Sequence, residues 1–375
     1  MTFVCDGEPS RFTTLWTTQR ELIKATHDAD AIEDMTSREA VFQRIHGGGS
    51  ELPASDSLPG AKARGNVAYC NLEDAFIDAE ACVQVYYERC LKEDSISFQC
   101  GSAVHHVLMD RGTAEGVALE DGRTLQAARV VVAAGAWSNR LVSLEKRIDP
   151  IAIEVAWLKV TPDEEKRWKH MAITTNFSTG LNLFPPYNGE IKILRRSAGY
   201  KNTVEVAHPE DASKTLCISY PRTVITHPTD EIPLGAEKAL RDNLREIMPP
   251  LAERAFDRTK LCWYVVLSFS FETPPCPSRA NSRLRAWNRV CTTPTADFLI
   301  APHPRVAGIH LATGGSAHAW KFLPVLGDLI VDSMEGTLSP ELVEKWAYER
   351  GRGGDYNAPR MDGEPEELRD VVRSQ

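Results

Sequence analysis

The sequence predicts an α/β domain that is interrupted by a second domain rich in β-strands. The run VVVAAG, residues 130–135, is continuously apolar, as parallel strands buried on both faces are. The run VAGIHLA, residues 306–312, reads as a second short buried strand that leads into a glycine turn. Between these two runs, roughly residues 146–260 alternate strand-like pieces with turns, which predicts an antiparallel sheet with a few helices.

Local patterns predict the remaining elements. DAEACVQVYYERC, from Asp78, is typical of an amphipathic helix with acidic residues in its first turn, and we expect its apolar side chains to pack in a core. EDG before RTL predicts a hairpin. In LATGGSAHAWKFLPVLG, residues 311–327, a strand meets a glycine turn and a helix start with Pro324 in its first turn. Such a turn either offers backbone N–H groups to an anionic ligand or merely links two elements.

Composition favours a small-molecule partner. The 375 residues carry a net charge of -9, which gives no electrostatic footprint for nucleic acid or an anionic membrane. The apolar runs are too short to span a bilayer, and MTFVCDGEPSR lacks the regions of a secretory signal, so we expect an intracellular protein. The nine cysteines are odd in number and form no CxxC pair, which indicates neither a disulfide framework nor a metal site.

Four motifs follow one another in the order found in one enzyme group. They are RVVVAAGAWSNRLV (residues 129–142), CWY (262–264), TPTADFLI (293–300) and LATGGSAHAWKFLPVLG (311–327). From about Gly65 to the C-terminal tail the chain resembles the FAD-dependent amine oxidases. Within that family it is similar to monomeric sarcosine oxidase, the pipecolate and saccharopine oxidases, and the fructosyl amino acid oxidases.

This resemblance implies an α/β plus α+β fold. An FAD-binding Rossmann-like domain of the glutathione-reductase type would be interleaved with an antiparallel-sheet substrate domain. The expected division is 1–65, substrate-domain helices and loop; 66–145, first segment of the FAD-binding domain; 146–264, substrate sheet; 265–292, atypical insertion; 293–345, second segment of the FAD-binding domain; and 346–375, an extended polar tail.

Two departures from the family pattern stand out. The family begins with a strand, a GxGxxG turn and a helix that cradle the ADP pyrophosphate, and this sequence has none of them. GGGS at 47–50 follows no apolar strand and is no substitute, so we expect an N-terminally truncated chain that lacks the first βαβ unit. Residues 265–292 make the distance between CWY and TP longer than it is in the family. Either a retained intron or a genuine loop insertion would explain the extra length.

The resemblance implies a set of contacts with FAD. Cys262 matches the cysteine that the family links covalently to the 8α-methyl group, and a thiolate is the nucleophile such a bond needs. The turn with Gly314 would present N–H groups to the N1 and C2 carbonyl edge of the flavin. A plain strand end at Gly135 and a free cysteine at 262 are the alternatives. The implied contact residues are Ala134, Gly135, Trp137, Cys262, Gly314, Gly315, Ser316, His318, Lys321 and Phe322.

Two lysines carry the implied catalysis. Lys192, in EIKILRRS, matches the lysine that promotes reduction of oxygen, and its place opposite Ile191 and Ile193 suits either a cavity or the solvent. Lys321 matches the lysine that holds the substrate carboxylate. Arg195 and Arg196 either pair with a second substrate carboxylate or face solvent.

The implied reaction is oxidation of the C–N bond of a secondary amine or N-substituted amino acid by hydride transfer to flavin N5. Oxygen then takes the electrons, giving hydrogen peroxide, and the imine hydrolyses. The amine and oxygen are the expected partners of a monomer in the cytoplasm or the peroxisome, although the chain ends in RSQ rather than a Ser-Lys-Leu address. A non-catalytic chain that cannot hold FAD and a flavin dehydrogenase with another acceptor are the alternatives.

Overall fold

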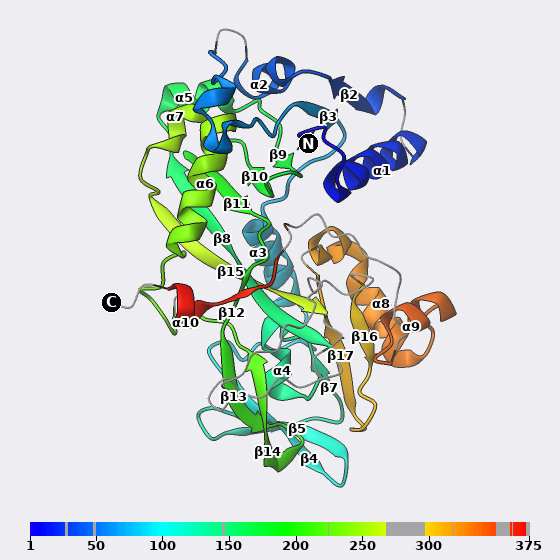
Figure 1. Cartoon of the computed structure of the whole chain (residues 1–375). Helices are drawn as coiled ribbons and strands as arrows, with labels where there is room; N and C mark the ends of the chain where they lie inside the picture. The colour runs from blue at the N-terminus through cyan, green and yellow to red at the C-terminus, as the bar shows by residue number, and fades with distance from the viewer. Residues whose placement is uncertain are drawn as a thin grey trace.

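The computed structural model describes residues 1–26, 29–47, 50–144, 147–223, 225–267, 297–316, 318–349, 361 and 363–372. The largest portion of it is a ten-stranded sheet (Figure 1). Across the sheet the strands are β18 (Glu366–Glu367), β12 (Tyr200–Lys201), β8 (Ile148–Lys159), β11 (Glu190–Arg195), β10 (Leu181–Leu183), β9 (Thr174–Asn176), β1 (Thr2–Cys5), β3 (Val67–Asn71) and β2 (Ile32–Met35). A further strand, β15 (Arg258–Leu267), pairs with β8 along the edge opposite to β11.

One face of this sheet forms the main core. One of the few helices expected between residues 146 and 260 is α6 (Leu234–Ile247), which lies along β8 and β11 in Figure 1 and buries Leu240 and Leu244. Ile191 and Ile193 of β11 point to the same core and are 0% exposed. The helices around this region are α1 (Arg11–Thr26), α2 (Arg38–His46), α5 (Pro162–Trp168), α6 (Leu234–Ile247) and α7 (Pro249–Ala252).

A second region holds the predicted parallel strands. β7 (Val130–Val132) pairs in parallel with β17 (Ile309–Thr313), and β16 (Leu299–Pro302) pairs antiparallel with β17 on its other side. The predicted hairpin is confirmed within the small sheet of β4 (Val104–Asp110), β5 (Thr113–Leu119) and β6 (Thr124–Gln126). Helices α3 (Ala79–Cys90), α4 (Ser138–Leu141), α8 (Leu323–Glu335), α9 (Pro340–Trp346) and α10 (Leu368–Val371) and the hairpin of β13 (Thr203–His208) and β14 (Asp211–Ser219) complete the described chain.

Two predictions of burial are wrong. β7 has β17 as its one strand partner in the described chain, and Val131 is 42% exposed rather than buried on both faces. The helix predicted from Asp78 is confirmed as α3, capped by the Asp78 side chain, but none of its residues is buried. Val83 and Tyr86 are exposed. An apolar stripe shows which face of a helix can pack against another element, but no described element covers the apolar face of α3.

The C-terminal residues also differ from the sequence prediction. Instead of an extended tail, residues 366–371 add β18 beside β12 and continue into α10, and Leu368 lies fully buried in the main core. Within the described residues, no helix has the length and apolar character needed to cross a membrane.

Candidate functional site

The turns that follow β7 and β17 meet at one edge of their sheet. These strands are parallel, so their carboxyl ends lie at the same edge, where ligands bind in open α/β sheets. Ser138 Oγ donates to the Gly135 carbonyl oxygen at 2.8 Å and to Thr313 Oγ1 at 3.2 Å. The glycine turn at 135 and the glycine turn at 314 are therefore held together by hydrogen bonds.

Both turns contain backbone that favours glycine. Gly135 begins the short 3₁₀ helix η4 (Gly135–Trp137) with φ +52°, and no atom lies within 4 Å of a Cβ built on it. Gly314 has φ +73°, and Ser316 has φ +47°. At the first of these turns, Ala134, which precedes Gly135, is half-buried, whereas Trp137 is exposed.

Two N–H groups that follow the second turn donate hydrogen bonds inside the chain. The N–H groups of His318 and Ala319 both donate to the Gly315 carbonyl oxygen, at 3.0 and 3.1 Å, and Ser316 Oγ donates to the Gly314 carbonyl oxygen. His318 and Phe322 pack against the buried ring of Phe298, with centroids 5.3 Å away in each case. The predicted flavin contacts at these positions stay predictions.

Cys262 and Lys192 lie on one face of the ten-stranded sheet. Lys192 is paired with Trp157 of β8, and Cys262 is paired with Ile153 of the same strand. Partners in register share a face, and residues four apart on a strand share it too. The two side chains therefore leave the face opposite to the α6 core, about 13 Å apart along the strands.

The strands β15 and β8 also contact the second region. β15, which carries the exposed Cys262, contacts η4, and so does β8. Trp263, next in the chain, packs against both the main core and the core under β7 and β17. The structure thus places the Gly135 turn, and the Gly314 turn bonded to it, beside the strand that carries Cys262.

Lys321 follows the Gly314 turn in the chain and lies in the short helix η6 (Ala319–Phe322). Its side chain is exposed, and Nζ is 5.3 Å from the centroid of the Phe322 ring.

Two aromatic rings lie near Lys192, and no sequence motif predicted them. Its Nζ lies 5.2 Å from the ring centroid of Phe184 and 5.9 Å from that of Trp157. The Arg258 guanidinium carbon lies 4.0 Å from the centroid of the same Trp157 ring. No local pattern predicts these contacts, because only the register shows that Lys192 and Arg258 flank Trp157 on the two neighbouring strands.

Arg195 fits neither of its sequence interpretations. It lies on the α6 face, where its Nη1 is 3.5 Å from Glu154 Oε1 and its Nε donates to the Thr179 carbonyl oxygen. Glu154 is 0% exposed and also accepts a hydrogen bond from Ser197 Oγ at 2.7 Å. Burial raises the pKa of Glu154, while Ser197 and Arg195 oppose that rise.

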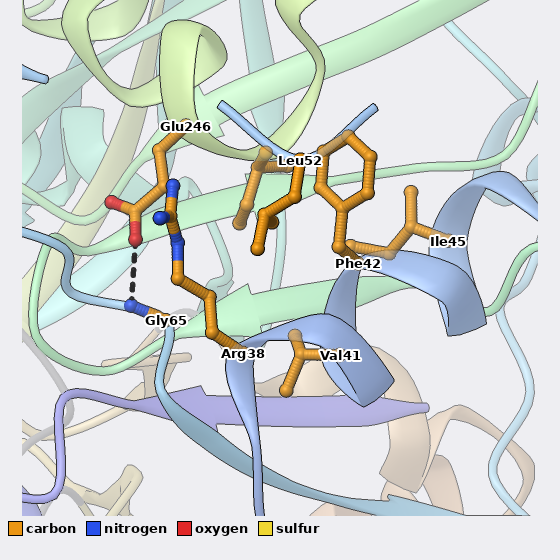
Figure 2. Close-up of a pocket in the computed structure, with 8 residues that line it drawn as sticks. Arg38, Val41, Phe42, Ile45, Leu52, Gly65 and Glu246 are labelled. Carbon is orange, nitrogen blue, oxygen red and sulfur yellow. Dashed lines mark hydrogen bonds between the residues drawn. The ribbon is translucent and has the colours of Figure 1, made fainter. Parts of the chain in front are cut away.

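A second buried carboxylate borders a small pocket on α6. Glu246 Oε1 accepts hydrogen bonds from the N–H groups of Arg64 and Gly65, at 2.7 and 2.8 Å. Figure 2 shows the Arg38 guanidinium beside this carboxylate and the apolar side chains of Phe42 and Leu52 next to it. The pocket has room for about one water molecule. It contains no sequence-predicted site residue, so we assign it a structural role.

The described residues suit the ring end of FAD. Gly135 leaves open space at a sheet edge, and the Cys262 thiol is exposed on a strand that contacts η4. The indole Nε1 of Trp263 is enclosed and has no hydrogen-bond partner within the described portion of the chain. Open backbone and an exposed thiol are what a covalently held ring requires.

The described residues contain no turn that suits the pyrophosphate of FAD. β1, a turn and α1 form a strand–turn–helix, but Asp6 and Glu8 make this turn acidic. Its N–H groups are also engaged, because Asp6 Oδ1 accepts from Glu8 N and Ser10 Oγ accepts from Thr13 N. A pyrophosphate needs bare N–H groups and positive potential. Gly48 and Gly49 of the GGGS run lie outside the described residues, as does most of the predicted 265–292 insertion.

Comparison with known proteins gives consistent results. The chain is 28% identical over 232 residues to an L-saccharopine oxidase of Schizosaccharomyces pombe, covering 62% of this chain and 47% of that protein. It therefore spans about half the length of that relative. It is 24% identical over 377 residues to an amino acid oxidase of Aspergillus flavus, covering 89% of this chain and 72% of the relative.

Solved structures confirm the predicted fold class. A modified fructosyl peptide oxidase from Aspergillus nidulans superposes with a TM-score of 0.78 at 22% identity, over 99% of this chain and 78% of that one. The family model described as FAD dependent oxidoreductase matches residues 12–333, which include both glycine turns, Lys192 and Cys262. That match covers most of the sequence, and the chain belongs to the family of FAD-dependent oxidoreductases.

Proposed function

We propose that this chain oxidises the C–N bond of a secondary amine or N-substituted amino acid, with oxygen as the electron acceptor. The products are an imine, which hydrolyses, and hydrogen peroxide. The substrate class follows the family resemblance and the activities by which the relatives are named, an L-saccharopine oxidase and amino acid oxidases.

The observation that carries the proposal is the shared face of Cys262 and Lys192. Both side chains leave the ten-stranded sheet away from its core, and the strand that bears Cys262 contacts the Gly135 turn. A sheet face that carries an exposed thiol and a half-buried lysine, on strands that contact a glycine turn, suits a flat redox ring better than a structural core does.

Each residue has one task in the proposal. FAD, when bound, supplies the two-electron acceptor for the amine. Cys262 anchors the ring, and the turn at Gly314 faces its polar edge. Lys192 provides the positive charge that stabilises reduction of oxygen, while Lys321 binds the substrate carboxylate.

Acid precipitation tests the anchor. If Cys262 forms the link, the yellow colour of the full chain stays with the precipitated polypeptide and is absent from the pellet of Cys262→Ser. The buried Cys5→Ser is the matched control, which should keep the bound colour. Release of flavin by acid from the unmutated protein argues against the anchor. A colourless purified protein argues instead for the non-catalytic alternative.

Separate half-reactions test the two lysines. Lys192→Met should leave anaerobic reduction by substrate largely intact and slow reoxidation by oxygen by about 100-fold or more, as loss of a preorganised charge does. Lys321→Met should weaken reduction at low substrate concentration. Impairment of reduction alone in both variants would refute the division of roles. Substrate-dependent dye reduction without peroxide would identify a dehydrogenase.

A further inference from the structure

We propose that Trp157 and Phe184 are positioning residues that hold the Lys192 ammonium as an unpaired cation on the open face of the sheet. The inference rests on the proposed function, in which Lys192 serves oxygen. It adds the two rings that fix where this charge lies and keep its field uncancelled.

The geometry supports a cation held by rings. Lys192 Nζ lies within 6 Å of two aromatic centroids, at 5.2 Å from Phe184 and 5.9 Å from Trp157, which is the range of cation–π attraction. The Phe184 backbone N–H also donates to the Lys192 carbonyl oxygen at 3.0 Å, so the ring and the lysine are joined through the main chain.

The neighbouring acid is already engaged. Glu190 precedes Lys192 by two positions and shares its face, and its Oε2 accepts from Arg258 Nη2 at 2.7 Å. Within the described chain, no carboxylate oxygen lies within 4.0 Å of Lys192 Nζ. Aromatic rings attract the ammonium without adding formal negative charge, so its positive field still extends outward.

The Trp157 ring is itself held in place. Lys192, Trp157 and Arg258 are register partners on β11, β8 and β15, so they form one row across three paired strands. The Arg258 guanidinium carbon lies 4.0 Å from the Trp157 ring centroid, and Arg258 is itself bonded to Glu190 of β11. A ring that packs against this bonded guanidinium, on a strand paired along both edges, has little freedom to turn and gives the lysine a fixed partner.

This arrangement predicts an effect on one half-reaction. Replacing either ring leaves the charge of Lys192 in the molecule but frees its position. Reoxidation by oxygen should then slow by about 2- to 30-fold, the range that a cation–π contact supports, whereas reduction by the amine should change little.

Nuclear magnetic resonance of the full chain tests the geometry independently of activity. Reductive methylation with ¹³C-formaldehyde keeps lysine charged, and loss of one signal in Lys192→Met assigns Lys192. The rings should shift its methyl protons upfield of those of exposed lysines. Trp157→Leu and Phe184→Leu should each reduce that shift, and Trp157→Phe should retain most of it. Phe256→Leu is the matched control, because its ring lies 4.4 Å from Arg241 in a separate contact.

The outcomes separate the two proposals. A Lys192 signal at the position of exposed lysines, or one unmoved by both leucine variants, overturns the positioning role. A shifted signal in a protein that makes no peroxide supports the ring geometry and contradicts the proposed function instead. If far-ultraviolet circular dichroism shows that Trp157→Leu does not fold, Phe184→Leu decides, since Phe184 is the nearer ring.

Discussion

The core face of the ten-stranded sheet and the parallel pair of β7 and β17 use apolar sequence differently. Three of the residues of β11 are charged (Glu190, Lys192 and Arg195), yet Ile191 and Ile193 are completely buried under α6. In β7 every residue is valine, yet Val131 is 42% exposed. The strand with the charged residues is the better packed of the two, so apolar content by itself did not measure burial here.

The difference lies in what covers each strand. β11 has strands on both edges and a helix across one face, whereas β7 has β17 along one edge within the described chain. A side chain gains free energy from burial only where another element removes it from water. The valines of β7 therefore contribute less to the stability of this chain than the isoleucines of β11.

The largest predicted effect compares these strands directly. Ile193→Ala should lower the free energy of unfolding by about 2–5 kcal/mol, because it leaves a cavity between Leu183, Ala156 and α6. Val131→Ala should cost less than about 1 kcal/mol, because much of the valine is already in water. Urea unfolding of the two variants measures both values. Equal losses would mean that β7 is covered as completely as β11.

Sequence reasoning succeeded where a pattern is local. The start of α3 next to Asp78, the hairpin of β5 and β6 and the proline in the first turn of α8 each depend on a few neighbouring residues. The faces of Ile191, Ile193 and Lys192 also followed from strand alternation.

It failed where contacts join distant segments. The partners of Lys192 come from residues 157 and 184, and those of Glu246 come from residues 64 and 65. No periodicity in one segment encodes the register of another. β1 was missed for the same reason, since TFVC is too short to be recognised without its partner strands β3 and β9.

The second prediction concerns such a distant contact in the better packed region. Glu246→Ala should cost about 1–3 kcal/mol of unfolding free energy, because the N–H groups of Arg64 and Gly65 lose their acceptor. Glu246→Gln should cost less. It keeps an acceptor oxygen, and it removes the burial of a carboxylate whose pKa is raised by desolvation. Thermal unfolding at neutral pH compares the two, and a costlier glutamine variant would contradict this account.

The smallest effect distinguishes the two regions by pH. His46 lies in the first region, where its Nε2 donates to the Ile247 carbonyl oxygen at 2.7 Å and its ring stacks on Phe42. His310 lies on β17 in the second region, with its Nε2 3.1 Å from Ser333 Oγ. Burial lowers the pKa of both histidines below the ordinary value of 6.5.

The sign of the pH effect follows from these lowered values. Below pH 6.5 the unfolded chain binds protons that the folded histidines resist, so each histidine's contribution is complete above pH 6.5 and is lost as the pH falls. Urea unfolding between pH 7.5 and 5 should therefore show a shallower decline for His46→Gln and for His310→Gln than for the unmutated protein. Comparing each variant with the unmutated protein at the same pH cancels the contributions of the other titrating groups to the unfolding free energy. These groups include Glu154 and Glu246, whose raised pKa values change stability with pH in the opposite direction. The exposed His170→Gln is the control. A double variant as steep as the unmutated protein would show that neither region resists protonation of its histidine.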